Sequence, residues 1–155
     1  MKLSLDTSVA IEVIRGRRPH YRVWLEQSQA VGATLHLSSI VFHELMFGAM
    51  VSARPEHQME RVGWLTSRMD IHPWMPDDAA EAARIRADLR KSGTVVGTMD
   101  TLIAGQALNN DWTLVTDNLR EFVRIPNLQI LDWSDPAGPI DRSVAWKQLI
   151  RRPTK

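Results

Sequence analysis

Residues 95–118, VVGTMDTLIAGQALNNDWTLVTDN, carry the pattern of a helix followed directly by that of a strand. Apolar side chains from Met99 to Leu108 recur three and four residues apart, as on one face of a helix. The segment TLVT at 113–116 has the β-branched and apolar content of a short strand. Asp100 lies in the first turn of this predicted helix, and Asp117 directly follows the predicted strand. The stretch therefore predicts half of an α/β unit with two acidic residues beside it.

The rest of the chain repeats this alternation. Strand patterns lie at 2–5, 34–38, 70–74 and 128–133, and helix patterns lie at 9–15, around Tyr21 to Leu25, and at 39–50, 56–68 and 78–93, the last with Asp77 as its N-cap. Strands separated by helices predict an α/β fold, a three-layer α/β/α sandwich with a central, mainly parallel sheet. The strand at 2–5 alternates as a half-buried strand does.

We expect residues 1–133 to form this domain and residues 134–155 to be its basic C-terminal extension. The extension begins with turn-forming Pro and Gly and ends in a basic group of Lys147, Arg151, Arg152 and Lys155. Two interpretations remain open for it. Either it contacts RNA or a partner subunit, or it is a frayed terminus with solubilising charge.

The composition limits the chemistry that the chain can perform. Its 155 residues, 44% of them hydrophobic, correspond to one globular domain. The absence of Cys excludes thiolate metal sites and Cys nucleophiles, so a metal must be held by oxygen or imidazole, which favours Mg²⁺ or Mn²⁺. The formal charge of +1 means that any nucleic-acid-binding surface is local. We find no membrane-spanning run or signal-peptide pattern, and expect a cytoplasmic protein.

Four acidic residues are expected at one edge of the predicted sheet. Asp6 and Asp117 each follow a strand, while Asp100 begins a helix and Glu44 lies one turn into another. Ligands of open α/β sheets bind at the carboxyl ends of the strands, where these residues would meet. Ionised carboxylates at close range repel one another unless a cation lies between them, so a divalent metal is favoured. Taken singly, each acid is better explained as a cap, a turn or a solvated residue.

Four segments resemble the PIN domain, and specifically the VapC toxins of type II toxin-antitoxin systems. They are LDTSVAIEVIRG, SSIVFHELMFGA, IRADLRKSGTVVGTMDTLIAGQAL and LVTDNLREFVRIPNLQILDW, which together run from about residue 3 to residue 133 in that family's order. The resemblance implies a PIN-like sandwich and a Mg²⁺- or Mn²⁺-dependent endoribonuclease that hydrolyses RNA, with tRNA among the family's substrates. It also implies inhibition by a VapB-like antitoxin, a homodimer, and a higher assembly with the antitoxin.

The same resemblance assigns the site residues by position. Asp6, Glu44 and Asp100 match the family's first three acids, with Asp6 and Asp100 as metal ligands and Glu44 as a ligand or proton acceptor. The fourth position is divided between two neighbours. The family pattern places Asn118 in the slot and Asp117 just before it, and either could reach the site. The number of metal ions, one or two, stays open for the same reason.

Further residues are assigned supporting roles. Thr7 and Thr116 match hydroxyl positions that orient the acids or the attacking water, and Arg86 matches a basic position that pairs with an acid or a phosphate or is simply solvated. Met46 and Met50 are either core residues or part of an apolar groove for the antitoxin. Candidates for phosphate contacts, each also explicable as solvated surface, are Arg15, Arg17, Arg18 and Lys91.

Two other functions remain open. Asn118 in the fourth slot would remove one negative charge, which suggests a catalytically weak PIN scaffold that binds RNA or a protein partner. A phosphohydrolase of the haloacid dehalogenase type would need a second Asp two residues after Asp6, where Ser8 stands. A zinc protease is improbable because the HE pair at 43–44 is not completed to HExxH, with Phe47 at the second His position. The remaining His residues look scattered rather than clustered.

Overall fold

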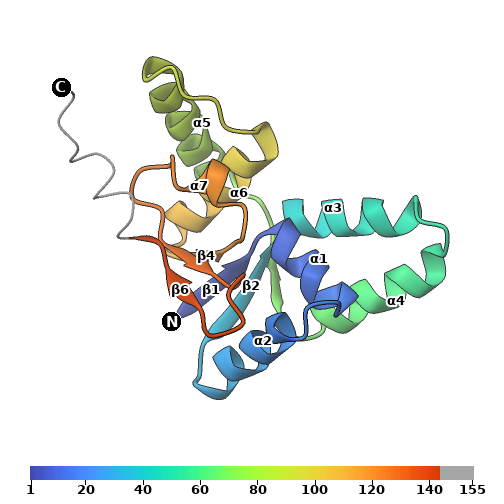
Figure 1. Ribbon diagram of the computed structural model, residues 1–155. Coiled ribbons are helices and arrows are strands. Elements are labelled where there is room, and N and C mark those ends of the chain that lie inside the picture. Colours follow the sequence, from blue (N-terminus) through green and yellow to red (C-terminus); the bar gives the residue numbers. More distant parts are fainter. Residues whose placement is uncertain (144–155) are drawn as a thin grey trace.

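The computed structural model describes residues 1–143, which form six strands and seven helices (Figure 1). In chain order these are β1 (Lys2–Leu5), α1 (Thr7–Arg15), α2 (His20–Ala30), β2 (Thr34–Ser38), α3 (Ser39–Met50), α4 (Pro55–Thr66), β3 (Asp70–His72), α5 (Pro76–Lys91), α6 (Thr98–Asn109), β4 (Thr113–Val115), α7 (Leu119–Phe122), β5 (Ile130–Asp132) and β6 (Ile140–Asp141). The basic group near the C-terminus that the sequence singled out lies outside the described residues.

The strands form one sheet in the order β3-β2-β1-β4-β5-β6. The pairs from β3 to β5 are all parallel, and β6 alone runs antiparallel, beside β5. The prediction of a mainly parallel sheet is therefore confirmed. The antiparallel strand β6 was not predicted, because its two residues are too few to carry a pattern.

Helices cover both faces of this sheet (Figure 1). Helices α1 to α4 contact one another on one side, while α5, α6 and α7 pack together on the other. This division follows from right-handed crossovers. The chain adds β2 and β3 on one side of β1, so the helices between these strands cover one face. It then returns to β4 on the other side of β1, so the helices that follow β3 cover the opposite face. The three-layer prediction is confirmed. Within residues 1–143 no helix combines the length and the hydropathy needed to cross a membrane.

The central strands are buried on both faces. Leu3 and Leu5 of β1 are fully buried, as the pattern predicted, but Ser4 between them is only 1% exposed. The half-buried interpretation of this strand was wrong, because a parallel sheet covered by two helical layers hides alternate side chains on both sides. In β2 the same effect buries His36 and Ser38.

The start of α5 also differs from the prediction that Asp77 caps it. The helix begins at Pro76 with Met75 in the cap position, and the carboxylate of Asp78 accepts the Met75 N–H at 2.8 Å. Asp78 is 1% exposed and also accepts hydrogen bonds from Asn109 and Asn110 at the end of α6. Proline at the first helical position needs no N–H partner, which moved the start upstream by two residues.

Candidate active site

Asp6 lies at the junction of β1 and α1, directly after the central strand. It has an extended backbone and caps α1 by accepting the Thr7 N–H at 2.7 Å. Its second carboxylate oxygen accepts the hydroxyls of Ser8, at 3.0 Å, and Thr116, at 2.9 Å. Burial raises the pKa of Asp6, which is 3% exposed, although these hydrogen bonds oppose the rise. The capping role and the place in an acidic site are thus combined in one residue.

Thr116 reaches Asp6 because β4 lies beside β1. The Asp6 N–H donates to the carbonyl of Val115 at 3.0 Å, which continues the parallel pairing of the two strands past their ends. Thr116 is fully buried, so its hydroxyl holds the Asp6 carboxylate in one orientation. Thr116 also accepts the backbone N–H of Asn118 at 3.0 Å. The orienting role of Thr116 in the reaction stays a prediction.

Glu44 comes to the site from α3. The hydroxyl of Thr7, at the start of α1, donates a short hydrogen bond to Glu44 Oε2. Thr7 therefore stands between the first two acids, with its N–H on Asp6 and its hydroxyl on Glu44. The supporting role of Thr7 stays a prediction.

Asp100 lies in the first turn of α6 and is half-buried. Its pKa is raised from 3.8 to about 6, first by burial and then by the negative charges of Asp6, Glu121 and Glu44. Charges act on one another in this way only at short range, so the structure brings together acids from four elements. The site lies beyond the carboxyl end of β1, as the fold predicts.

Glu121, on α7, is a member of this group that the sequence analysis missed. Its carboxylate accepts the N–H of Gly97, just before α6, at a long 3.4 Å, and its charge raises the pKa of Asp100. The sequence signal that could have identified Glu121 is its position four residues after Asp117, which is about one helical turn. The helix α7 is only four residues long, which is too short to show a periodic pattern.

The structure separates the roles of Asp117 and Asn118. Asp117 accepts the hydroxyl of Ser8 at 2.6 Å and that of Tyr21 at 2.9 Å, and the guanidinium of Arg18 lies 4.0 Å away. Ser8 also donates to Asp6, so it lies between the two carboxylates, and the charge of Asp117 helps to raise the pKa of Asp6. Asn118 instead occupies the N-cap position of α7, without a cap hydrogen bond from its side chain, and donates its backbone N–H to Thr116.

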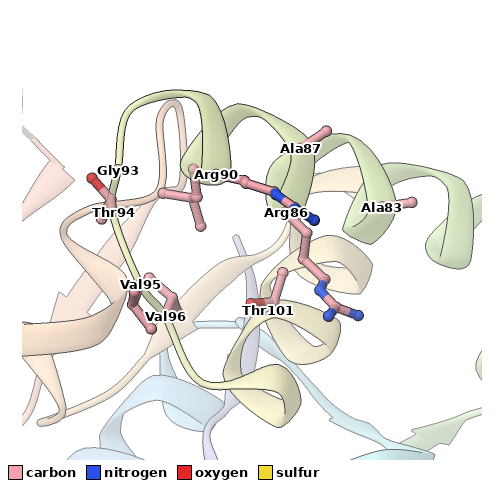
Figure 2. Close-up of a pocket in the computed structure, with 10 residues that line it drawn as sticks. Ala83, Arg86, Ala87, Arg90, Gly93, Thr94, Val95, Val96 and Thr101 are labelled. Carbon is pink, nitrogen blue, oxygen red and sulfur yellow. The ribbon is translucent and has the colours of Figure 1, made fainter.

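Two pockets have basic residues in their walls, and the smaller of them contains Glu44. Figure 2 shows Arg86 and Arg90 extending from α5 over a pocket of about 600 Å³ that is closed by residues 93–96 and by Thr101, the neighbour of Asp100. A second pocket, of about 380 Å³, is lined by Glu44 together with Arg15 and Arg17. Positive charge beside the acids suits a substrate that carries phosphates.

The other proposed phosphate contacts are paired differently. Arg18 forms an ion pair with Glu12 at 3.1 Å and approaches Asp117, so part of its charge is already matched. Lys91 is 3.9 Å from Asp88 on the same helix. These two residues are therefore less available to a phosphate than the basic residues of the two pockets.

The donor set fits a divalent cation. Asp6 and Asp100 are carboxylates whose pKa values burial and mutual repulsion raise, so a doubly charged ion between them would remove an unfavourable interaction. All neighbouring donors are oxygens, which suits hard ions such as Mg²⁺ or Mn²⁺. Asp6 and Asp100 as the metal ligands stay a prediction.

The model of the PIN domain family matches residues 3–128. The chain is 37% identical over 133 residues to the tRNA(fMet)-specific endonuclease VapC of Salmonella typhimurium, covering 86% of this chain and 98% of that protein. It is 33% identical over 129 residues to the ribonuclease VapC2 of Rickettsia felis, covering 83% and 96%.

Solved structures agree with these relatives. The fold matches a chain of VapBC2 from Rickettsia felis bound to a DNA fragment from its promoter, with a TM-score of 0.82, 31% identity, and coverage of 86% of this chain and 100% of that chain. It also matches a chain of DNA-bound VapBC from Salmonella typhimurium, with a TM-score of 0.80, 36% identity, and coverage of 86% and 98%. The similarity therefore extends over nearly the full length of each solved chain.

Proposed function

Because this chain belongs to the VapC branch of the PIN-domain family, we propose that it is a metal-dependent endoribonuclease toxin. The observation that carries the proposal is the convergence of Asp6, Glu44 and Asp100 from three elements. Thr7 bonds both Asp6 and Glu44, and burial, followed by the charges of Asp6, Glu121 and Glu44, raises the pKa of Asp100 to about 6. The reaction is the hydrolysis of an RNA phosphodiester bond. The ion, Mg²⁺ or Mn²⁺, is part of the proposal.

Each residue of the site has a task in this reaction. Asp6 and Asp100 would hold the metal, which when bound supplies positive charge to polarise the phosphate and to activate water. Thr116 and Ser8 fix the orientation of the Asp6 carboxylate through their hydroxyls. Thr7 donates to Glu44 Oε2 and leaves Oε1 free to accept the proton of the attacking water.

The basic pockets would bind the RNA backbone on either side of the acids. Arg86 and Arg90 lie on the α6 side, while Arg15 and Arg17 lie beside Glu44 on the α3 side. Contacts of this kind release counterions, so the affinity for RNA should fall as salt rises. This arrangement supports an extended or looped RNA as the substrate rather than a small phosphate ester.

The substrate and the partners are proposed from the relatives. The Salmonella typhimurium relative is named a tRNA(fMet)-specific endonuclease, so a tRNA is the first substrate to test. The similar solved structures are VapBC complexes, which supports a VapB-like antitoxin as partner and inhibitor of this chain. A homodimer and a higher assembly with the antitoxin stay predictions. A cytoplasmic location stays a prediction.

The end of α3 offers an apolar surface to such an antitoxin. Phe47 is 60% exposed, Met50 57% and Val51 65%. An apolar helix of the antitoxin lying there would cover these three side chains. The interpretation of Met50 as part of an antitoxin groove is supported, whereas Met46 packs partly against the core.

The nuclease activity can be tested with antitoxin-free protein and total RNA. We expect discrete fragments in Mg²⁺ or Mn²⁺, no cleavage in EDTA, and a loss of about 100-fold or more in Asp6→Asn and Asp100→Asn, because each variant removes a charged ligand. Mapping the fragment ends would identify the RNA and the cleavage site.

The matched control is Asp77→Asn, which neutralises an exposed acid on the first turn of α5. This variant should cleave like the wild type. Cleavage that persists in EDTA or in both site variants would contradict the proposed mechanism, and a wild type that binds RNA without cutting it would favour the scaffold alternative. The engagement of Asp117 with Ser8 weakens that alternative, since the fourth charge is retained.

A further inference from the structure

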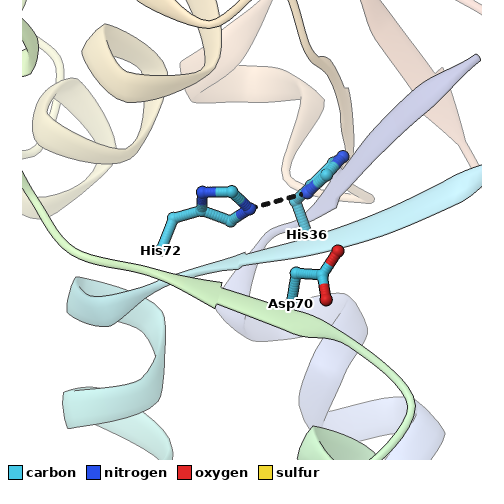
Figure 3. A group of neighbouring side chains, drawn as sticks. All are labelled: His36, Asp70 and His72. Carbon is cyan, nitrogen blue, oxygen red and sulfur yellow. Dashed lines mark hydrogen bonds between the residues drawn. The ribbon is translucent and has the colours of Figure 1, made fainter.

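Three potential metal ligands meet on β2 and β3, apart from the acids described above (Figure 3). The parallel register pairs His36 with Asp70 and Ser38 with His72, so the strand alternation places His36, Asp70 and His72 on one face of the sheet. One ligand atom from each residue lies within 4.8 Å of the other two. The expectation that the His residues are scattered was wrong for this pair, because 35 intervening residues fold back to lay β3 beside β2.

The two imidazoles face each other through their nitrogens. His36 Nδ1 and His72 Nε2 are 2.9 Å apart, and His36 Nε2 is 2.9 Å from Thr34 Oγ1. Two protonated nitrogens cannot share such a contact, so at least one of the facing nitrogens offers a lone pair. A consistent assignment has His36 donate from Nε2 to Thr34, which leaves its Nδ1 lone pair directed at His72. This is the usual arrangement of a metal-binding histidine, whose other nitrogen donates to a neighbour.

Trp112 fixes the orientation of both rings. Its indole stacks on His36 with the ring centroids 4.9 Å apart and the planes 3° from parallel, and it meets the edge of His72, also at 4.9 Å. Trp112 is 4% exposed and His36 8% exposed. The histidines are therefore held in place before any ligand arrives, while Asp70 and the half-exposed His72 leave a side open to solvent.

We propose that His36, His72 and Asp70 form a second metal site, one that takes a divalent transition metal such as Zn²⁺. With Zn–N bonds of about 2.0–2.1 Å, tetrahedral coordination needs the two nitrogens about 3.3 Å apart. The nitrogens must therefore separate by about 0.4 Å, and the more exposed His72 ring must turn so that both lone pairs point at the ion. Asp70 supplies the third ligand and water the fourth. The proton on His72 Nε2 moves to Nδ1 or to solvent when the metal binds.

The site has a structural consequence for the edge of the sheet. Within residues 1–143, β3 is a three-residue strand at the edge of the sheet that pairs with β2 alone, and two of its residues would be metal ligands. A metal bridging His36 to Asp70 and His72 would tie this strand to β2. Imidazole ligands favour Zn²⁺ over Mg²⁺, so the two sites of the chain would select different ions.

Zinc titration of a protein whose acidic site has been disabled tests the proposal. The starting protein is Asp6→Asn/Asp100→Asn, freed of metal with a chelator and titrated with Zn²⁺ by calorimetry. We expect one Zn²⁺ per chain, unaffected by excess Mg²⁺, and a rise in the melting temperature. Adding His72→Ala should weaken binding by about 10-fold or more, as should Asp70→Asn, because each removes a ligand. Co²⁺ in place of Zn²⁺ reports nitrogen ligands through its visible absorption.

The control is His57→Ala on the same background, since His57 is an exposed histidine of α4. Its affinity for Zn²⁺ should be unchanged, and circular dichroism should show all variants folded. The proposal is overturned if Zn²⁺ does not bind, if binding survives both His72→Ala and Asp70→Asn, or if His57→Ala weakens it equally. Because the acidic site is disabled throughout, the result is independent of the proposed nuclease activity.

Discussion

The fold holds the acidic residues of the candidate active site close together although their negative charges repel one another. Asp6 is buried at the start of α1, and Asp100 is half-buried near two other negative charges. Without a cation, ionising either residue costs the folded state free energy that the unfolded chain does not lose. The folded protein is thus prepared to bind a divalent ion, which would offset that cost.

This cost predicts a specific pH dependence for the metal-free protein. The pKa of Asp100 is 3.8 in the unfolded chain and about 6 in the folded one, so the folded state holds a proton that the unfolded state has lost. Stability from this group is complete below the lower value and is lost as pH rises through the upper one. Asp100 is half exposed, so solvent weakens the effect. We expect the free energy of unfolding of Asp100→Asn to rise by about 1–2 kcal/mol relative to that of the wild type between about pH 4 and pH 7.

Urea unfolding in EDTA at both pH values measures this difference. Asp77→Asn serves as the comparison, since Asp77 is exposed and should follow the wild type. If the stabilities of Asp100→Asn and the wild type change in parallel at all pH values, the pKa of Asp100 is not raised in the folded chain. Added Mg²⁺ should stabilise the wild type more than Asp100→Asn.

The fourth position of the site can be assigned by comparing two neighbouring residues. Asp117 shares the hydroxyl of Ser8 with Asp6, whereas Asn118 acts through its backbone N–H. We expect Asp117→Asn to lower RNA cleavage by about 10–100-fold, as is typical when a partner of a metal ligand is lost. Asn118→Ala keeps the backbone N–H that bonds Thr116, so its cleavage rate should fall much less. Cleavage rates at saturating metal measure both, and the reverse order would assign the position to Asn118.

At the scale of elements, α6 is positioned by its close approach to α5. A Cβ added to Gly105 would lie 2.6 Å from the Cβ of Ala82 and 2.8 Å from its Cα. This contact is backbone against backbone, so neither helix can yield without moving. Since α6 also carries Asp100, the spacing of the two helices sets the position of an active-site acid.

Gly105→Ala should therefore destabilise the protein by about 1–3 kcal/mol, as overpacking of a filled core does. The matched control is Gly63→Ala in α4, where an added Cβ meets nothing within 4 Å. That variant should be stabilised by about 0.5–1 kcal/mol, because alanine restricts the unfolded chain. Thermal unfolding of the two variants measures the contrast, and equal effects would show that the α5–α6 contact is not tight.

At the scale of the whole molecule, residues after 133 contribute to the sheet. β6 pairs with β5, and Arg142 donates to the buried carboxylate of Asp132 at 3.0 Å. Burial favours the neutral form of Asp132, but hydrogen bonds from Ser134 and Arg142 outweigh it and lower its pKa. Ser134 and Arg142 thus stabilise the buried negative charge of Asp132. Both residues lie beyond residue 133, where we predicted that the domain ends.

Truncation tests that boundary. A chain of residues 1–133 loses both Ser134 and Arg142 and should unfold about 3 kcal/mol more easily than a chain of residues 1–143, because Asp132 is left buried and unpaired. Chemical denaturation of the two proteins gives the comparison. Equal stability of the two chains would support the boundary at residue 133.

Local patterns in the sequence determined the fold class and the order of its elements. Short-range periodicity places β1, α3, α6 and β4, and the position of Asp6 directly after a strand follows from that order alone. The acids Asp6, Glu44 and Asp100 were expected together because parallel strands end at one edge of a sheet. These inferences need only the pattern of neighbouring residues and the parallel sheet that follows when strands alternate with helices.

Only the tertiary structure decided which side chains touch. The separation of Asp117 from Asn118, the addition of Glu121 and the meeting of His36 with His72 all depend on contacts between residues far apart in the chain. The physical reason is the distance along the chain over which each kind of information acts. Periodicity records how a residue relates to its neighbours along one element, whereas a hydrogen bond or a charge interaction depends on atomic distances that are set by the packing of several elements at once.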